Sequence, residues 1–237
     1  MTYVTADIHG NLDALNECLD KVNFDIEKDT LISLGDMVDG HLYSKQVVEK
    51  LMSIKNFTGL VGNHESFLLE TYSTGCCKPL HYQQGGKQTM ESYNYNIPKE
   101  HIEFIKQMPY YLIKDNCLFC HGGLPSYLLK KIANYSQVND DDVLGLISKD
   151  LSLITWDRSL VEDVVFGKFN PKGKPFDRIY VGHTTTQCLN KDKSCLPVIK
   201  NGLYCLDTGA GWDGKLTFYC IETDKFYQST KSISPRC

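Results

Sequence analysis

Two short polar motifs, each directly after a run of apolar residues, constrain this chain more than any other feature. The first is Gly-Asp-Met-Val-Asp at Gly35–Asp39, after Leu31–Leu34, and the second is Gly-Asn-His-Glu at Gly62–Glu65, after Leu60 and Val61. Short apolar runs are typical of buried strands, and a glycine lets the chain turn sharply where a strand ends. The motifs therefore place a carboxylate, a carboxamide and an imidazole at one edge of a sheet, where open α/β sheets bind ligands.

The first part of the chain alternates strands with helices. Strands are predicted at residues 3–6, 30–34 and 57–61, and amphipathic helices at residues 12–22 and 44–54. This alternation implies parallel strands joined by right-handed crossovers. Because the ends of parallel strands meet at one edge of the sheet, we expect the polar turns to converge.

The later part of the chain is richer in strands. Residues 110–120 are predicted to form a hairpin, residues 179–181 a strand, and the tail antiparallel strands at 203–206, 216–221 and 226–228. Further helices are expected at residues 65–72, 98–106 and from 140, with a looser polar stretch at 73–96. This order predicts an α/β fold of two sheets packed face to face with helices outside. Because no linker, repeat or low-complexity tract interrupts the chain, we expect residues 1–237 to form one domain.

Composition argues against several classes of protein. A hydrophobic share of 42% is ample for a core, and a formal net charge of -4 gives no basic footprint for nucleic acid and no basic face for a membrane. The N-terminus has no basic region followed by a long apolar one, and no stretch is long enough to span a bilayer, so we expect a cytoplasmic protein. In that reducing compartment, the ten cysteines should be free thiols or metal ligands.

One cysteine pair has a competing interpretation. Cys117–His121 reads Cys-Leu-Phe-Cys-His, which matches the attachment pattern of haem c and also a CxxC motif. Haem attachment requires export, for which no signal is visible, and His121 has a better assignment as a metal ligand. We therefore interpret both thiols as strand side chains, where cysteine acts as a small hydrophobe.

Five predicted strand ends carry possible metal ligands. These ligands are Asp7 with His9, Asp36, Asn63, His121 and His183. Oxygen and imidazole donors without cysteine suit Mn, Fe or Zn and argue against a structural thiolate site. Two divalent cations about 3.5–4 Å apart can share a carboxylate and clamp a phosphoryl group, and Asp36 is the natural bridge. Water held between them would have a lowered pKa and become a nucleophile.

The motifs resemble those of the calcineurin-like metallophosphoesterases. They are, in the family's order, Asp7–Gly10, Gly35–Asp39, Gly62–Glu65, His121–Gly123 and Gly182–Thr184. They are most similar to the phosphoprotein phosphatase branch, especially the compact bacterial and phage serine/threonine phosphatases, and the resemblance covers residues 7 to about 209. It implies an α/β/β/α sandwich and hydrolysis of phosphate esters by a metal-bound hydroxide that attacks phosphorus directly and in line, without a covalent intermediate.

The resemblance gives each site residue a role. The first metal site is matched by Asp7, His9 and Asp36, and the second by Asp36, Asn63, His121 and His183. His64 matches the general acid that protonates the leaving alkoxide, and Asp39 matches the carboxylate that orients it. Arg158 matches a phosphate-binding arginine whose fork fits two phosphate oxygens, with Asn63 and His64 also at the phosphate. The Gly85-Gly86 pair resembles a family glycine pair near the site.

The chain departs from the family pattern at one position that bears on the substrate. The family reads Gly-Asp-x-x-Asp-Arg-Gly, whereas this chain has Gly40 and His41 in the last two positions. One of two arginines that hold the phosphate is therefore replaced, which should weaken binding of a phosphate dianion. Either His41 or a nearby lysine compensates in part, or the substrate is not a phosphoprotein.

Three functional hypotheses remain open. The first is a cytoplasmic phosphomonoesterase of the serine/threonine protein phosphatase type with two divalent cations, Mn²⁺ first and Fe or Zn as alternatives, that acts on a phosphoprotein or a small phosphate ester or nucleotide. The second is a dinucleoside polyphosphate hydrolase or phosphodiesterase on the same scaffold. The third is a catalytically weak binding module, which is disfavoured because every ligand position holds a competent donor.

Overall fold

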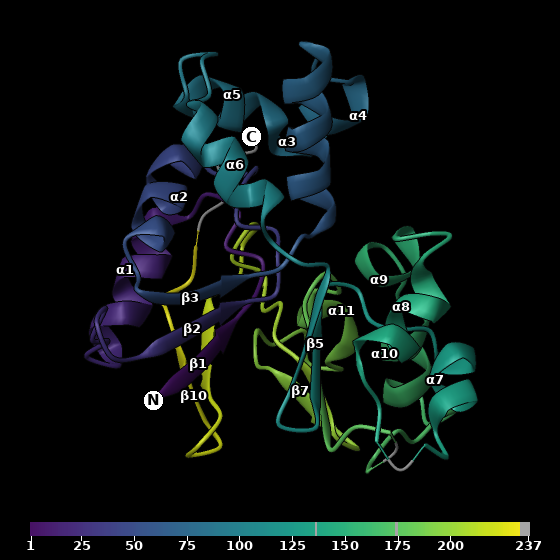
Figure 1. Cartoon of the computed structure of the whole chain (residues 1–237). Helices are drawn as coiled ribbons and strands as arrows, with labels where there is room; N and C mark the ends of the chain where they lie inside the picture. Colours follow the sequence, from purple (N-terminus) through teal and green to yellow (C-terminus); the bar gives the residue numbers. More distant parts are fainter. Residues whose placement is uncertain (136, 174, 233–237) are drawn as a thin grey trace.

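The computed structural model describes residues 1–135, 137–173 and 175–232, and its strands form two five-stranded sheets (Figure 1). The first sheet has the strand order β10-β9-β1-β2-β3. Its strands are β1 (Thr2–Thr5), β2 (Thr30–Ser33), β3 (Asn56–Gly59), β9 (Thr217–Cys220) and β10 (Lys225–Gln228). The neighbours β1, β2 and β3 are parallel, in the register Tyr3 to Leu31 to Phe57. The parallel units expected from the first part of the chain are thus confirmed.

The second sheet has the strand order β4-β5-β6-β8-β7. Its strands are β4 (Tyr111–Lys114), β5 (Cys117–Cys120), β6 (Arg178–Val181), β7 (Val198–Lys200) and β8 (Leu203–Cys205). The three inner strands are parallel, and the two edge strands run antiparallel to their neighbours. The hairpin expected at residues 110–120 is confirmed as β4 and β5.

Helices cover the outer faces of both sheets and one end of the first. Figure 1 shows α1 and α2 beside the first sheet, α7 to α10 beside the second, and α3 to α6 gathered at the top. The first six helices are α1 (Leu12–Lys21), α2 (Ser44–Met52), α3 (Asn63–Thr74), α4 (Pro79–His81), α5 (Lys87–Ser92) and α6 (Lys99–Lys106), with a π-type turn, η1 (Tyr82–Gly86), between α4 and α5. The others are α7 (Ser126–Ile132), α8 (Asp140–Ile147), α9 (Ser152–Thr155), α10 (Ser159–Val165) and α11 (Thr186–Leu189). Within the described ranges, no helix combines the length and apolar character that a membrane crossing requires.

Alternating side chains divide the interior into three apolar layers. On β1, Tyr3 packs with the helices outside the first sheet, whereas Val4 faces the second sheet. On β5, Phe119 faces the first sheet, whereas Leu118 and Cys120 pack with the helices outside the second. Because successive strand residues point to opposite faces, each sheet is buried on both sides. The result is the four-layer α/β/β/α sandwich that the resemblance implied.

The cysteines that matched a CxxC pattern are strand side chains, as expected. Cys117 lies in the layer between the sheets, while Cys120 lies in the layer outside the second sheet. Side chains on opposite faces of a strand cannot pair with each other, and the nine cysteines within the described ranges are all free thiols. Cys237 lies outside the described residues.

Two expectations about local structure were wrong. The stretch at residues 73–96 is not a loose polar segment, because it forms α4, η1 and α5. Gly85, at a φ of +106°, breaks the helical path, so the segment has no continuous helical period. The strand β8 is not simply part of an antiparallel tail. It turns back from β7 through Asn201 and Gly202 and pairs on its other side with β6, to which it runs parallel.

The layer between the sheets should be sensitive to truncation at its aromatic centre. The Tyr180 ring is fully buried, stacks on Phe119 at 4.8 Å, and faces Tyr219 of the other sheet at 6.0 Å. We expect Tyr180→Ala to lower the free energy of unfolding by about 3–5 kcal/mol, measured by urea denaturation, because it leaves a cavity between the sheets. The control Tyr127→Ala, at a 55% exposed position, should change it by about 0.5 kcal/mol or less. Equal losses in the two variants would contradict this layer's role.

Candidate metal centre

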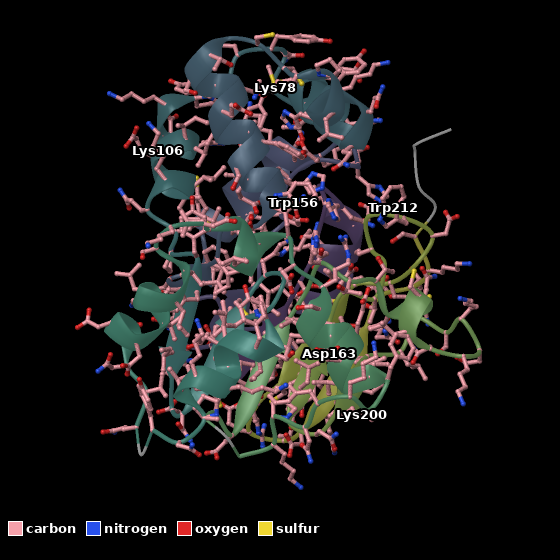
Figure 2. All side chains as sticks on the ribbon, turned by 90° about the vertical axis from the view of Figure 1, so that its right-hand side faces the viewer. Lys78, Lys106, Trp156, Asp163, Lys200 and Trp212 are labelled. Carbon is pink, nitrogen blue, oxygen red and sulfur yellow. The ribbon has the colours of Figure 1, made fainter. Side chains whose placement is uncertain are left out.

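A cavity of about 300 Å³ is lined by most of the residues that the motifs singled out, with Asp39 and His121 outside its lining. Its lining consists of Asp7, His9, Asp36, Asn63, His64, Gln84, Trp156, Arg158, His183, Thr185, Asp207 and Trp212. His121 is fully buried, with its Nε2 atom 3.0 Å from Asn63 Oδ1. Trp156 and Trp212, both labelled in Figure 2, line this cavity. The turns that follow strands of both sheets therefore meet at one place.

The site residues adopt a backbone conformation that side chains usually avoid. The φ angles of Asp7, His9, Asp36 and His183 are +54°, +51°, +53° and +61°. A left-handed backbone at a residue other than glycine costs energy and is concentrated at functional sites. Space is also made for the ligands, because a Cβ atom on Gly62 would collide with Asp36 Oδ1. The local backbone is thus shaped around the side chains that point into the cavity.

A buried glutamate ties the two central motifs together. The Glu65 carboxylate is fully buried and accepts backbone N–H bonds from Asp36 at 2.7 Å, Met37 at 2.8 Å and Gly62 at 2.9 Å. Hydrogen bonds to a charged acceptor are the stronger kind. Glu65 thereby fixes the turn after β2 against the turn after β3, so that Asp36 and the residues after Gly62 keep their relative positions.

Three histidines present one ring nitrogen to the cavity and use the other to hold their orientation. The outward nitrogens face backbone carbonyl oxygens: His9 Nδ1 to Val38 O at 3.2 Å, His121 Nδ1 to Leu34 O at 2.9 Å, and His183 Nε2 to Trp156 O at 3.1 Å. A carbonyl oxygen only accepts, so each outward nitrogen carries the proton. In the neutral form of each ring, the inward nitrogen presents a lone pair to the cavity, which is the usual arrangement of a metal-binding histidine.

Those lone pairs converge with oxygen atoms that also only accept. His121 Nε2 lies 3.0 Å from Asn63 Oδ1 and 3.2 Å from Asp36 Oδ2. Two groups of three residues each offer possible ligand atoms, and within each group these atoms lie within 4.8 Å of one another. One group is His9, Asp36 and His64, and the other is Asp36, His121 and His183. Asp36 belongs to both groups. Acceptors gathered in this way suit divalent cations, and oxygen and nitrogen donors without a thiolate suit Mn, Fe or Zn.

The buried carboxylates of the cavity also favour binding of a cation. Burial, together with the charges of Asp207 and Asp36, raises the pKa of Asp7 well above its usual range, and burial raises the pKa of Asp207 to about 6. Burial likewise opposes ionisation of Asp36, but nearby histidines outweigh it and hold its pKa well below the usual value. Burial, followed by the charge of His121, lowers the pKa of His183 to about 3, which favours the neutral ring that a metal needs.

His64 and Asp39 form a buried pair at the edge of this cluster. His64 Nδ1 lies 2.7 Å from Asp39 Oδ2, and His64 Nε2 faces the cavity, 3.8 Å from Asp36 Oδ2. Burial lowers the pKa of His64, but the charges of Asp36 and Asp39 outweigh it and raise the pKa to about 9. The ring is therefore protonated at neutral pH, with one N–H held by Asp39 and the other available to a bound molecule.

The positively charged side of the cavity carries the arginine that the motifs suggested. Arg158 lines the cavity, and its Nη2 donates to His183 O at 3.4 Å. His41 does not take the place of the replaced arginine in the cavity lining, since it borders a separate cavity with its Nε2 3.0 Å from Ala210 O. Gly40 has a φ of +92°, which a side chain rarely adopts, so the turn fits glycine rather than arginine.

Several residues of the site carried no assignment from the sequence. They are Glu65, His81, Gln84, Asp207 and Trp212. Glu65 stood within a quoted motif, and Asp207 follows the apolar run at residues 203–206, so the strand-end signal was present for both. The other three lie in segments without such a signal, and only the fold brings them to the cavity.

Comparison with known proteins agrees with this geometry. A family model described as calcineurin-like phosphoesterase matches residues 2–187. A symmetrical bis(5'-nucleosyl)-tetraphosphatase of Hamiltonella defensa is 39% identical over 147 residues, which are 55% of this chain and 47% of that protein, so the match spans about half of the relative. Serine/threonine-protein phosphatase 2 of Salmonella typhimurium is 25% identical over 224 residues, which are 93% of this chain and 92% of that protein.

Solved structures share the fold at low identity. A cold-active protein-tyrosine phosphatase of a psychrophilic Shewanella superposes with a TM-score of 0.64 at 16% identity, over 96% of this chain and 76% of that one. A protein serine/threonine phosphatase of Saccharomyces cerevisiae superposes with a TM-score of 0.58 at 16% identity, over 98% of this chain and 79% of that one. At such identities the likeness concerns the fold alone.

Loss of the shared carboxylate should lower the amount of metal that the cavity retains. We expect the wild-type protein, loaded with Mn²⁺ and passed through a desalting column, to retain about two ions per chain by elemental analysis, as in two-metal sites. Asp36→Asn should retain one or none, because its side chain loses the charge common to both groups. The control Asp192→Asn, at an exposed position outside the cavity, should match the wild type. Equal retention by Asp36→Asn and wild type would refute the shared-ligand arrangement.

Proposed function

Since the chain belongs to the calcineurin-like phosphoesterase family, we propose that this metallophosphoesterase is a phosphomonoesterase of the serine/threonine protein phosphatase type with two divalent cations in its cavity. The observation that carries the proposal is that Asp36 belongs to two groups of possible ligand atoms, one of which also contains His64 of the buried His64–Asp39 pair. Two metal ions next to a general acid can catalyse hydrolysis of a phosphate ester.

The metal-binding residues divide into two sets that share one carboxylate. Asp7, whose Oδ1 lies 3.9 Å from His9 Nε2, would hold one cation with His9 and Asp36. Asp36, Asn63, His121 and His183 would hold the other. When bound, such cations supply charge that polarises phosphoryl oxygens, and they activate a water molecule. The carbonyl contacts of the histidine rings keep the inward nitrogens in place, so the ligand set is formed before the ions arrive.

His64 would act as the proton donor to the leaving group. Its Nδ1 proton is engaged by Asp39, and its Nε2 faces the cavity, so the Nε2 proton is the one that can be transferred. The neighbouring carboxylates raise its pKa to about 9, which keeps the proton in place at neutral pH. The alkoxide that leaves a phosphomonoester is a strong base, and it takes up this proton as the ester bond breaks.

Arg158 would bind the phosphate oxygens at the rim of the cavity. Its guanidinium lines the cavity and is held there by His183 O. A planar fork of donors suits two oxygens of a phosphate group and favours a dianion over a neutral molecule. With glycine at position 40, Arg158 carries this task without the second arginine of the family pattern.

A second candidate function is hydrolysis of dinucleoside polyphosphates. Two observations favour it, namely the replaced arginine and the presence of Trp156 and Trp212 on the lining of the cavity, with Trp212 47% exposed. An exposed indole can stack on a nucleobase. One relative of this chain, from Hamiltonella defensa, is named as a symmetrical bis(5'-nucleosyl)-tetraphosphatase.

A substrate panel separates the two candidates. The Mn²⁺-loaded protein would be assayed on 4-nitrophenyl phosphate, a phosphoserine peptide and diadenosine tetraphosphate. We expect turnover of both monoesters, abolished by a chelator and restored by Mn²⁺, with kcat/KM for the peptide above that for the dinucleotide. A higher kcat/KM for diadenosine tetraphosphate would support the second candidate instead. No turnover of any of the three would overturn the proposed function.

The role of Arg158 can be tested against another arginine of the chain. We expect Arg158→Ala to raise KM for phosphomonoesters by about 10–100-fold, the loss of one or two charge-assisted hydrogen bonds, with a smaller change in kcat. Arg178→Ala is the matched control, because Arg178 pairs with Asp224 outside the cavity. A KM for Arg158→Ala that equals the KM of the control would show that the guanidinium does not bind phosphate.

A further inference from the structure

A second histidine binds the same carboxylate as His64, from the side away from the cavity. His81 closes the short helix α4, is 1% exposed, and its ring stacks on Phe67 at 5.4 Å with an interplanar angle of 25°. The ring also packs against Gly86, where a Cβ atom would lie 2.5 Å from its Cδ2. The chain thus holds an imidazole ring in a fixed place behind Asp39.

Hydrogen bonds at both ring nitrogens fix the tautomer of His81. Its Nε2 lies 3.0 Å from Asp39 Oδ2 and 3.2 Å from Asp39 Oδ1. A carboxylate only accepts, so Nε2 carries a proton and donates it. On the other side of the ring, Nδ1 lies 2.8 Å from Thr71 Oγ1, whose hydroxyl group can donate to a neutral ring, and 3.5 Å from Cys77 Sγ. The geometry therefore forms a chain of donors that runs from Thr71 through His81 to Asp39.

The carboxylate of Asp39 is held between two imidazoles. Its Oδ2 accepts from His64 Nδ1 at 2.7 Å and from His81 Nε2 at 3.0 Å. Within the described ranges, these two rings are the side-chain donors recorded for this carboxylate. The backbone N–H of Asp39 is fixed separately, by Thr89 Oγ1 at 2.8 Å. A carboxylate that met only His64 could rotate about its last bond, whereas His81, within reach of both oxygens, fixes its plane.

We propose that His81 is a positioning residue, which holds the Asp39 carboxylate so that His64 keeps its Nε2 proton aimed at the leaving group. This inference rests on the proposed function, in which His64 is the proton donor. The segment that forms α4 and η1 then has a role in the site, because it places the His81 ring next to Asp39.

Two substitutions of His81 separate positioning from packing. In His81→Gln, the amide nitrogen reaches about as far as Nε2 and can still donate to Asp39. In His81→Asn, the shorter amide corresponds to Nδ1, so it can meet Thr71 but cannot reach Asp39. Both are polar and similar in size, so a difference between them reports the contact with Asp39. Thermal unfolding and bound Mn²⁺ would be measured for both.

The expected effect depends on the leaving group. A phosphoserine peptide releases a strongly basic alkoxide that needs a proton, whereas 4-nitrophenolate leaves without one. We expect His81→Asn to lower kcat for the peptide by about 10–100-fold, the usual effect of removing an outer hydrogen-bond partner, with KM nearly unchanged. The loss on 4-nitrophenyl phosphate should be several times smaller, and His81→Gln should restore most of the peptide activity.

Equal losses on the two esters, or equal losses in the two variants, would overturn the proposal. Adding His81→Asn to His64→Asn should cost nothing further, since the residue acts through His64, and additive losses would also contradict it. Should His81→Asn fail to fold, Thr71→Val keeps the shape of the helix surface and removes the nearer of the two groups that face Nδ1, leaving Cys77 Sγ at 3.5 Å. It should then show the same selectivity for the peptide, and a uniform loss would count against the proposal.

A measurement without turnover keeps the two proposals distinct. In metal-free protein labelled with ¹⁵N-histidine, the His64 Nδ1 proton should give a slowly exchanging, downfield resonance, assigned by its absence in His64→Asn. It should persist in His81→Gln and be lost or broadened in His81→Asn, and an unchanged resonance in His81→Asn would refute the positioning role. Absence of all phosphatase activity in the wild type would instead refute the proposed function.

Discussion

The molecule depends on one constraint, which is that acceptor groups from two sheets are buried together in one small space. Asp7, Asp36 and Asp207 are all nearly or fully buried, and inward lone pairs of several histidines point to the same cavity. Burying charge without a partner is costly, and the raised pKa values of Asp7 and Asp207 reflect that cost. Bound divalent cations would offset this free-energy cost. The same buried carboxylates therefore affect both the stability of this edge of the sandwich and its chemistry.

The surrounding structure serves to keep those groups from moving apart or turning away. Glu65 joins the turns after β2 and β3 through three backbone N–H groups, and carbonyl oxygens hold the histidine rings by their outer nitrogens. His81 in turn holds the Asp39 carboxylate, which orients His64. A site that is formed in advance avoids reorganisation when the substrate binds, which is where the catalytic benefit of such rigidity lies.

The parts that could be predicted are those in which a local signal and the global fold agree. An apolar run followed by glycine and a polar residue located Asp36 and Asn63, and parallel βαβ units follow from the alternation of strands and helices.

Prediction from the sequence failed where a segment shows no regular helical or strand spacing of its apolar residues. Gly85 interrupts the helical segment at residues 73–96, so the position of His81 behind Asp39 could not be read from the sequence. The Asn201-Gly202 turn, by contrast, was a readable signal for the antiparallel hairpin of β7 and β8, although it does not specify that β8 pairs in parallel with β6. Likewise, nothing near the hairpin of β9 and β10 states that it joins β1, because pairing between distant strands is decided by the whole fold.

The central claim is that Asp36 lies between two cations in this cavity. The most direct test is a crystal structure of the protein grown with Mn²⁺, with anomalous data collected near the manganese edge. We expect two anomalous peaks about 3.5–4 Å apart, with the Asp36 carboxylate between them and His9 and His121 on opposite sides. A cavity with no peak, or a single peak that the Asp36 carboxylate does not touch, would contradict the account.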